Sequence, residues 1–158
     1  MAGQQRNLLV AQSGGPTAVI NNSLVGVIEG ARGWWRIERV IGARRGIEGV
    51  LQEDLVDLYR ESPATLQRLR QTPSAALGTS RHKLREGDLE RIVEVFDRYN
   101  VGYFCYIGGN DSMDTANRIG ALARERGFDL QVMGIPKTVD NDLMATDHCP
   151  GYGSAARF

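Results

Sequence analysis

Two short polar segments, each following an apolar run, carry the residues best suited to chemistry. Residues 103–107 are apolar and lead through two glycines into the polar sequence NDS at 110–112. Residues 130–135 are also apolar and lead into PKTVDND at 136–142. Loops at the carboxyl ends of adjacent parallel strands face one crevice, so we expect these polar groups to converge. Their carboxylates, amides, hydroxyls and lysine suit a phosphorylated substrate and a metal ion.

The second polar loop offers the residue types that phosphoryl transfer requires. Thr138, Asp140 and Asp142 are spaced two apart, so in an extended loop their side chains share one wall. One carboxylate there can take the proton of an acceptor hydroxyl, and others can hold Mg²⁺. Lys137 adds a positive charge beside them. Taken alone, the segment also fits a simple turn, and Asp111 also fits a helix cap. The prediction of function therefore rests on both loops meeting.

The first 32 residues predict a strand, a glycine turn and a helix. Residues 7–12 are apolar, 13–17 contain two glycines and a proline, and 18–32 show helical spacing. Backbone N–H groups at such a helix start bind phosphate, although glycines also serve simple tight turns. The turn is neither GxGxxG nor a Walker loop, so the motif supports neither a dinucleotide-binding fold nor a P-loop NTPase.

The rest of the chain alternates strand and helix patterns. We expect further strands at 37–41, 54–59, 103–107 and 130–135, a strand-to-loop stretch at 75–83, and helices within 42–51, 62–70, 86–99, 111–127 and from Ser154 onward. This order predicts an α/β fold, with an open, mostly parallel sheet and helices on both faces. Two basic segments, Arg44-Arg45 and 75–83, either reach a phosphate or are solvated.

Length and composition indicate one ordinary globular domain over residues 1–158. Hydrophobic residues make up 42% and charged residues 24% of the chain. The 19 basic residues balance 19 acidic ones, so no global basic field favours nucleic acid or an anionic membrane. Two cysteines make no disulfide framework, and no apolar run approaches the ~20 residues of a membrane span. We expect a cytoplasmic protein without nucleic-acid or membrane partners.

Six motifs, in order along the chain, resemble those of the phosphofructokinase family. They are SGGPTAVINNSLVGVI, GARRGIEGVL, LGTSR, YIGGNDSMDTA, GIPKTVDNDL and TDHCPGYGSAARF, and the resemblance covers residues 8–158. It looks closest to the diphosphate-dependent branch. It implies phosphoryl transfer from diphosphate to the 1-hydroxyl of fructose 6-phosphate, a reaction of glycolysis that gives fructose 1,6-bisphosphate, with Mg²⁺ as cofactor.

The same resemblance has implications for the architecture. Chains of the family are markedly longer, so residues 1–158 would be a truncated N-terminal domain that carries the donor site and the catalytic loop. The second domain, and most of the sugar-phosphate site, would be absent from this chain. The full-length protein would be a homo-oligomer.

The resemblance also assigns roles in catalysis and specificity. Asp140 would be the base that deprotonates the sugar hydroxyl, and Lys137 would stabilise the transferring phosphoryl group. Thr138, Val139 and Asp140 would contact fructose 6-phosphate. Lys137 and Asp111 stand where ATP-dependent members carry glycine. The carboxylate of Asp111 would repel the α-phosphate of ATP, which is specificity through an unfavourable contact.

The remaining assignments concern the donor and the metal. The backbone of Gly15 would lie against the donor phosphates, with Arg81 of LGTSR as the donor-binding arginine and Ser112 in the same site. Asn110 stands where the family usually has a magnesium-binding aspartate. Its amide oxygen brings no charge, so the metal would lean more on nearby aspartates such as Asp142, or on diphosphate and water.

Two other functions remain open. The first is an ATP-dependent 6-phosphofructokinase, against which Lys137 and Asp111 argue. The second is an inactive phosphate-binding fragment of such an enzyme. Apart from Arg157, no lysine or arginine follows Asp142 to hold the sugar 6-phosphate, so we expect the 158-residue chain alone to have little or no activity.

Overall fold

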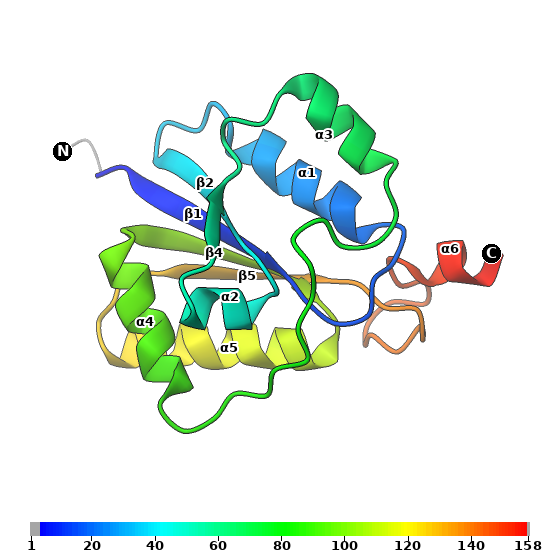
Figure 1. The fold of residues 1–158 in the computed structure, drawn as a ribbon. Coiled ribbons are helices and arrows are strands. Elements are labelled where there is room, and N and C mark those ends of the chain that lie inside the picture. The colour runs from blue at the N-terminus through cyan, green and yellow to red at the C-terminus, as the bar shows by residue number, and fades with distance from the viewer. Residues whose placement is uncertain (1–3, 158) are drawn as a thin grey trace.

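A single sheet forms the centre of the protein in the computed structural model, which describes residues 4–157 (Figure 1). Its strands are β1 (Arg6–Gln12), β2 (Ile37–Ala43), β3 (Leu55–Asp57), β4 (Val101–Gly108) and β5 (Gln131–Pro136). Their order across the sheet is β3-β2-β1-β4-β5. All neighbours run parallel except β3, which is antiparallel to β2.

Helices cover both faces of this sheet. They are α1 (Ile20–Ala31), α2 (Ile47–Leu51), α3 (Pro63–Arg70), α4 (Asp88–Arg98) and α5 (Asn110–Glu125), with α6 (Tyr152–Arg157) beyond the sheet edge. One core cluster joins the sheet to α1 and α3, and the other joins it to α2, α4 and α5. The predicted open, mostly parallel sheet with helices on both faces is confirmed.

The central strands β1 and β4 owe their position to continuous apolar sequence. Strands that are covered on both faces bury every side chain, so they read as unbroken apolar runs rather than alternating ones. Leu9 and Val10 of β1 and Phe104 and Ile107 of β4 are fully buried. The ring of Phe104 lies 5.1 Å from that of Phe96 on α4, which ties this helix to the sheet.

Local signals predicted two helix ends correctly and one incorrectly. The Ser62 hydroxyl accepts a hydrogen bond from the Thr65 amide at 3.1 Å, with Pro63 as the first helical residue of α3. Gly127 follows α5 with φ 64°, the conformation expected of a glycine helix stop. The last helix, however, begins at Tyr152 rather than after a Ser154 cap.

The stretch 75–83, expected to begin as a strand, has no regular structure. Strand β1 is already paired on both edges, by β2 and β4, and β2 is paired with β3. Side chains satisfy the backbone of this stretch instead. The Ala76 amide donates to Asn21 Oδ1 at 2.8 Å, and the Leu77 amide donates to Gln12 Oε1 at 2.9 Å.

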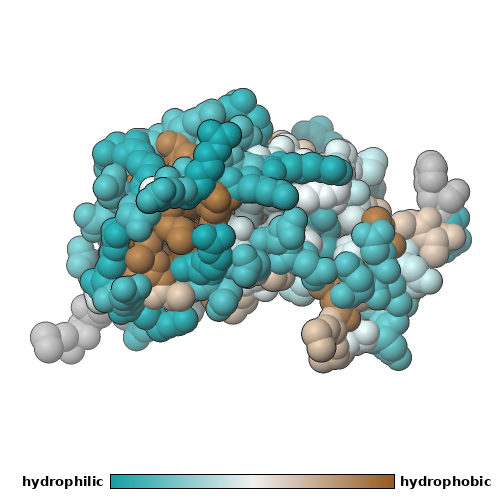
Figure 2. All heavy atoms as spheres, turned by 90° about the horizontal axis from the view of Figure 1, so that it is seen from below, coloured by the Kyte–Doolittle hydropathy of each residue, from teal (hydrophilic) through white to brown (hydrophobic). Residues whose placement is uncertain are grey.

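Hydrophilic side chains cover most of the face that lies below the sheet in Figure 1. Figure 2 shows this face, with hydrophobic residues gathered mainly in one area toward its left side. Among residues 4–157, none of the helices combines the length and the apolar character needed to cross a membrane.

Candidate active site

The carboxyl ends of three parallel strands bring the predicted site residues to one edge of the sheet. Gln12 at the end of β1 is in register with Ile107, and Gly108 is in register with Pro136. The glycine turn after β1, the NDS segment after β4 and the PKTVDND loop after β5 therefore leave the sheet side by side. In Figure 1 these ends point to the right, toward α6. Such an edge is where open α/β sheets bind ligands.

Lys137 joins the last of these loops to the first. Its amide donates to the Gly108 carbonyl at 3.0 Å, and its Nζ donates to the Gly15 carbonyl at 2.5 Å. The residue is only 3% exposed. Burial lowers the pKa of Lys137 below that of an ordinary lysine, and the nearby Asp140 carboxylate partly opposes this effect. A buried cation thus lies directly beneath the glycine turn.

Thr138 organises the PKTVDND loop as a bend rather than as the extended segment that the two-residue spacing suggested. Its hydroxyl donates to Asp142 Oδ1 at 2.8 Å and accepts from the Asp140 amide at 3.0 Å. Its own amide donates to the Pro150 carbonyl at 2.9 Å. The Asp140 residue and its neighbour Val139 remain exposed, as a contact with a ligand requires.

Asn110 and Asp142, the two predicted metal positions, lie side by side although they belong to different loops. The Asn110 Nδ2 donates to Asp142 Oδ2 at 2.9 Å. Both carboxylate oxygens of Asp142 thus accept hydrogen bonds. The side-chain oxygen of Asn110 accepts no hydrogen bond from residues 4–157. Over the same residues, no group of three histidine, cysteine, aspartate or glutamate side chains is arranged to hold a metal ion.

Asp111 and Ser112 lie in the first turn of α5 but differ in exposure. The N-cap of this helix is Gly109, which makes no side-chain cap hydrogen bond, so Asp111 is a first-turn residue rather than the N-cap. Asp111 is exposed, whereas Ser112 is buried. A Cβ atom on Gly108 would lie 2.1 Å from the Ser112 hydroxyl oxygen. Ser112 therefore packs against the end of β4, and its contact with a donor stays a prediction.

This close approach makes Gly108 sensitive to substitution. We expect Gly108→Ala to lower the free energy of unfolding by about 1–3 kcal/mol, because the first turn of α5 must shift to admit the methyl group. The matched control is Gly26→Ala on α1, where a new Cβ meets nothing within 4 Å and alanine favours the helix. Urea denaturation of both variants measures the difference. Equal stability of the two variants would contradict the packing described.

Arg81 lies on the irregular segment between α3 and α4, next to the end of β1. The Ser13 hydroxyl donates to the Ser80 carbonyl at 3.1 Å, which ties this segment to the glycine turn. The Arg81 side chain is exposed and makes no hydrogen bond or ion pair within residues 4–157. It is therefore available to an anionic ligand.

The sequence interpretation missed the buried polar residues that support these loops. Gln12 is fully buried, and its Nε2 donates to Asn21 Oδ1 at 3.1 Å. Asn21 in turn donates to the Thr72 carbonyl at 2.9 Å. The available signal was a glutamine at the end of an otherwise apolar strand, because buried polar side chains need partners.

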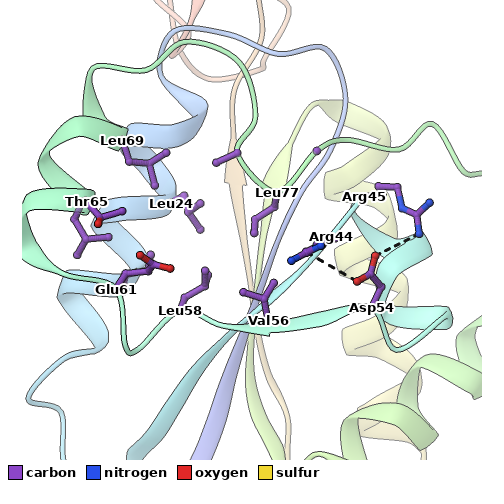
Figure 3. Close-up of a pocket in the computed structure, with 14 residues that line it drawn as sticks. Leu24, Arg44, Arg45, Asp54, Val56, Leu58, Glu61, Thr65, Leu69 and Leu77 are labelled. Carbon is purple, nitrogen blue, oxygen red and sulfur yellow. Dashed lines mark hydrogen bonds and ion pairs between the residues drawn. The ribbon is translucent and has the colours of Figure 1, made fainter.

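A hollow of about 720 Å³ lies apart from these loops, between α1, α3 and the edge of β2 and β3 (Figure 3). Leucines, among them Leu24 and Leu58, form much of its lining. Arg44 and Arg45 stand on its rim and both pair with Asp54, at 4.0 and 3.3 Å. These pairs favour a solvated role for the two arginines.

Comparison with known proteins identifies the family of the chain. The family profile described as Phosphofructokinase matches residues 7–158. The chain belongs to the phosphofructokinase family. The family resemblance that the six motifs indicated is therefore confirmed.

Individual members of the phosphofructokinase family differ in their similarity to the chain. The pyrophosphate–fructose 6-phosphate 1-phosphotransferase of Xanthomonas campestris pv. campestris is 49% identical over 157 residues, which are 96% of this chain and 37% of that protein. The pyrophosphate-dependent phosphofructokinase structure from Nitrosospira multiformis has a TM-score of 0.89 and 49% identity, and the match covers 94% of this chain and 38% of that one. The ATP-dependent 6-phosphofructokinase of Amycolatopsis methanolica is 30% identical over 148 residues, 92% of this chain and 31% of that protein. The chain thus spans less than two-fifths of these relatives.

Proposed function

We propose that residues 1–158 are the donor-binding and catalytic-loop domain of a diphosphate-dependent phosphofructokinase. The reaction is phosphoryl transfer from diphosphate, also called pyrophosphate, to the 1-hydroxyl of fructose 6-phosphate. The observation that carries this proposal is the buried Lys137 ammonium, held against the Gly15 carbonyl at the strand ends. The higher identity to pyrophosphate-dependent relatives than to the ATP-dependent one supports the choice of donor.

The loop residues divide the work of the reaction. Asp140 accepts the proton of the sugar hydroxyl as the bond to phosphorus forms, with Thr138 and Val139 beside it in contact with the sugar phosphate. Lys137 neutralises charge on the transferring phosphoryl group, which is worth most in a site that excludes water. Catalysis of this kind depends mainly on positioning and on electrostatic stabilisation.

The donor is bound by the glycine turn, the segment around Arg81 and the first turn of α5. Gly15 lets the backbone approach the diphosphate, and Arg81 adds a guanidinium that matches phosphate geometry. Asp111 disfavours ATP by placing a carboxylate near its α-phosphate. Ser112 belongs to the same site through the first turn of α5.

The protein ligands available at this site fit Mg²⁺ only as an ion that the protein shares with the substrate. Asn110 and Asp142 offer oxygen atoms on adjoining loops, but one amide and one carboxylate do not make a complete octahedral site. Mg²⁺ commonly takes one or two protein ligands and fills its remaining positions with phosphate oxygens and water. When bound, the ion would neutralise charge on the diphosphate oxygens.

The choice of donor is testable in the full gene product, meaning the protein that the complete reading frame encodes. We expect fructose 1,6-bisphosphate to form with diphosphate at a kcat/KM at least about 100-fold above that with ATP, because like charges placed together cost several kcal/mol. The double variant Asp111→Gly and Lys137→Gly should lower the ratio of kcat/KM with diphosphate to kcat/KM with ATP. Equal or better use of ATP by the unmodified protein would overturn the donor assignment.

An inactive phosphate-binding fragment is the second candidate function. Within residues 1–158, Arg157 is the only lysine or arginine after Asp142, so these residues by themselves offer little to hold the sugar 6-phosphate. The length of the reading frame distinguishes the two. A frame that ends at Phe158 favours the fragment, and a longer one favours an enzyme whose later residues form a second domain and a homo-oligomer.

A further inference from the structure

Both peptide groups that flank Arg81 are held by side chains, although the segment lies outside any helix or strand. On one side, the Ser80 carbonyl accepts the hydrogen bond from Ser13 at the end of β1. On the other side, the His82 amide donates to the Ser80 hydroxyl at 2.9 Å. The Arg81 side chain stays exposed between two restrained peptide groups.

Glu48 anchors this arrangement from α2. The Ser80 hydroxyl donates to Glu48 Oε2 at 2.9 Å while it accepts from the His82 amide. A serine hydroxyl has one proton and can accept as well, so the carboxylate fixes the direction in which Ser80 receives the amide. The neighbouring Ile47 and Val50 are buried in the core, which makes α2 a rigid support.

A second contact restrains the segment farther along. His82 Nε2 lies 2.8 Å from Asp88 Oδ2, and the same oxygen accepts from the Arg85 amide at 2.7 Å. This pair holds the chain after Arg81 against the start of α4. Glu48 and Ser13 are therefore the two residues outside the segment that hold Ser80, the neighbour of Arg81, and Glu48 is the charged one.

We propose that Glu48 is a positioning residue for the donor site: through the Ser80 hydroxyl it fixes the peptide group between Arg81 and His82, while Ser13 holds the peptide group between Ser80 and Arg81. This inference rests on the proposed function, in which Arg81 binds diphosphate. Its physical basis is preorganisation, because a backbone that is already ordered loses less conformational entropy when the guanidinium engages a phosphate. Glu48 itself need not touch the donor.

The experiment compares Glu48→Ala with Glu48→Gln in the full gene product, with steady-state kinetics in diphosphate and in fructose 6-phosphate. We expect Glu48→Ala to raise KM for diphosphate about fivefold to tenfold, as the loss of one hydrogen bond would. The kcat and the KM for fructose 6-phosphate should stay within about twofold. Glu48→Gln keeps an oxygen acceptor for Ser80, so it should restore KM for diphosphate to within about twofold of the unmodified value.

Ser80→Ala provides an independent variant, because it removes only the bridging hydroxyl. It should raise KM for diphosphate to a similar extent. In the double variant with Glu48→Ala, KM for diphosphate should be no higher than in the single variant that has the higher KM. Additive effects would show that Glu48 does not act through Ser80 and would overturn the proposal. If Glu48→Ala does not fold, Ser80→Ala alone decides through the same change in KM.

Two reference variants separate the possible outcomes. Glu38→Ala replaces an exposed glutamate on β2 and should change none of the constants. Arg81→Ala should raise KM for diphosphate more than Glu48→Ala does. If Arg81→Ala has no effect on that KM, the donor assignment itself fails. If Arg81→Ala raises KM for diphosphate and Glu48→Ala does not, only the positioning role is overturned. The same holds if Glu48→Ala lowers only the fraction of enzyme that is active.

Discussion

Asp140→Asn is expected to lower kcat for phosphorylation of fructose 6-phosphate about 10²–10⁴-fold, with little change in either KM. Asparagine has the same shape as aspartate but cannot accept the proton of the sugar hydroxyl. The backbone of the loop should survive the change, because the hydrogen bond with Thr138 uses the amide of residue 140 and not its side chain. Steady-state kinetics of the full gene product with diphosphate as donor measure the effect.

Asp147→Asn is the matched control for this variant. Asp147 is an exposed aspartate in the segment between PKTVDND and α6. Within residues 4–157, only its backbone carbonyl accepts a hydrogen bond, from Asn141 at 3.2 Å. Its replacement should leave kcat within about twofold. A value of kcat for Asp140→Asn within tenfold of the unmodified protein would exclude Asp140 as the base.

Lys137→Met is expected to lower kcat/KM for diphosphate about 10²–10³-fold, the usual cost of losing one preorganised charge contact in an active site. Methionine retains most of the apolar stem and removes the ammonium group that bonds to Gly15. Because the group is buried, the variant should unfold at a temperature no lower than the unmodified protein. A loss of less than tenfold would show that this cation does not assist transfer.

The same lysine predicts the direction of a pH effect. Burial lowers the pKa of Lys137 below its ordinary value of 10.5, so its positive charge is lost at a lower pH than that of an exposed lysine. Activity with diphosphate should therefore fall as pH rises through this lowered pKa. In Lys137→Arg, whatever activity remains should persist to higher pH, because arginine stays protonated.

Local patterns were sufficient to predict the layers of the fold. Unbroken apolar runs predicted the buried parallel strands β1 and β4, because a strand covered on both faces has no polar side. Spacing of three and four residues predicted α1, α4 and α5, because it produces one apolar helix face. The Ser62 cap and the Gly127 stop depend only on neighbouring backbone groups, so their residue types revealed them.

Other features depend on contacts between residues far apart in the chain, and no local pattern contains them. Ser80 bonds to Glu48, 32 positions away, and to Ser13, 67 positions away. These hydrogen bonds hold the segment 75–83 in place although it forms no strand.

The site loops show the same division. The sequence by itself determined that aspartates, an asparagine and a lysine follow the ends of two parallel strands, and which family they resemble. Only the tertiary structure decided that Lys137 is buried against Gly15, that Asn110 donates to Asp142, and that the loop bends at Thr138. Burial and hydrogen-bond partners are properties of the packed chain, since they depend on which strand ends become neighbours in the sheet.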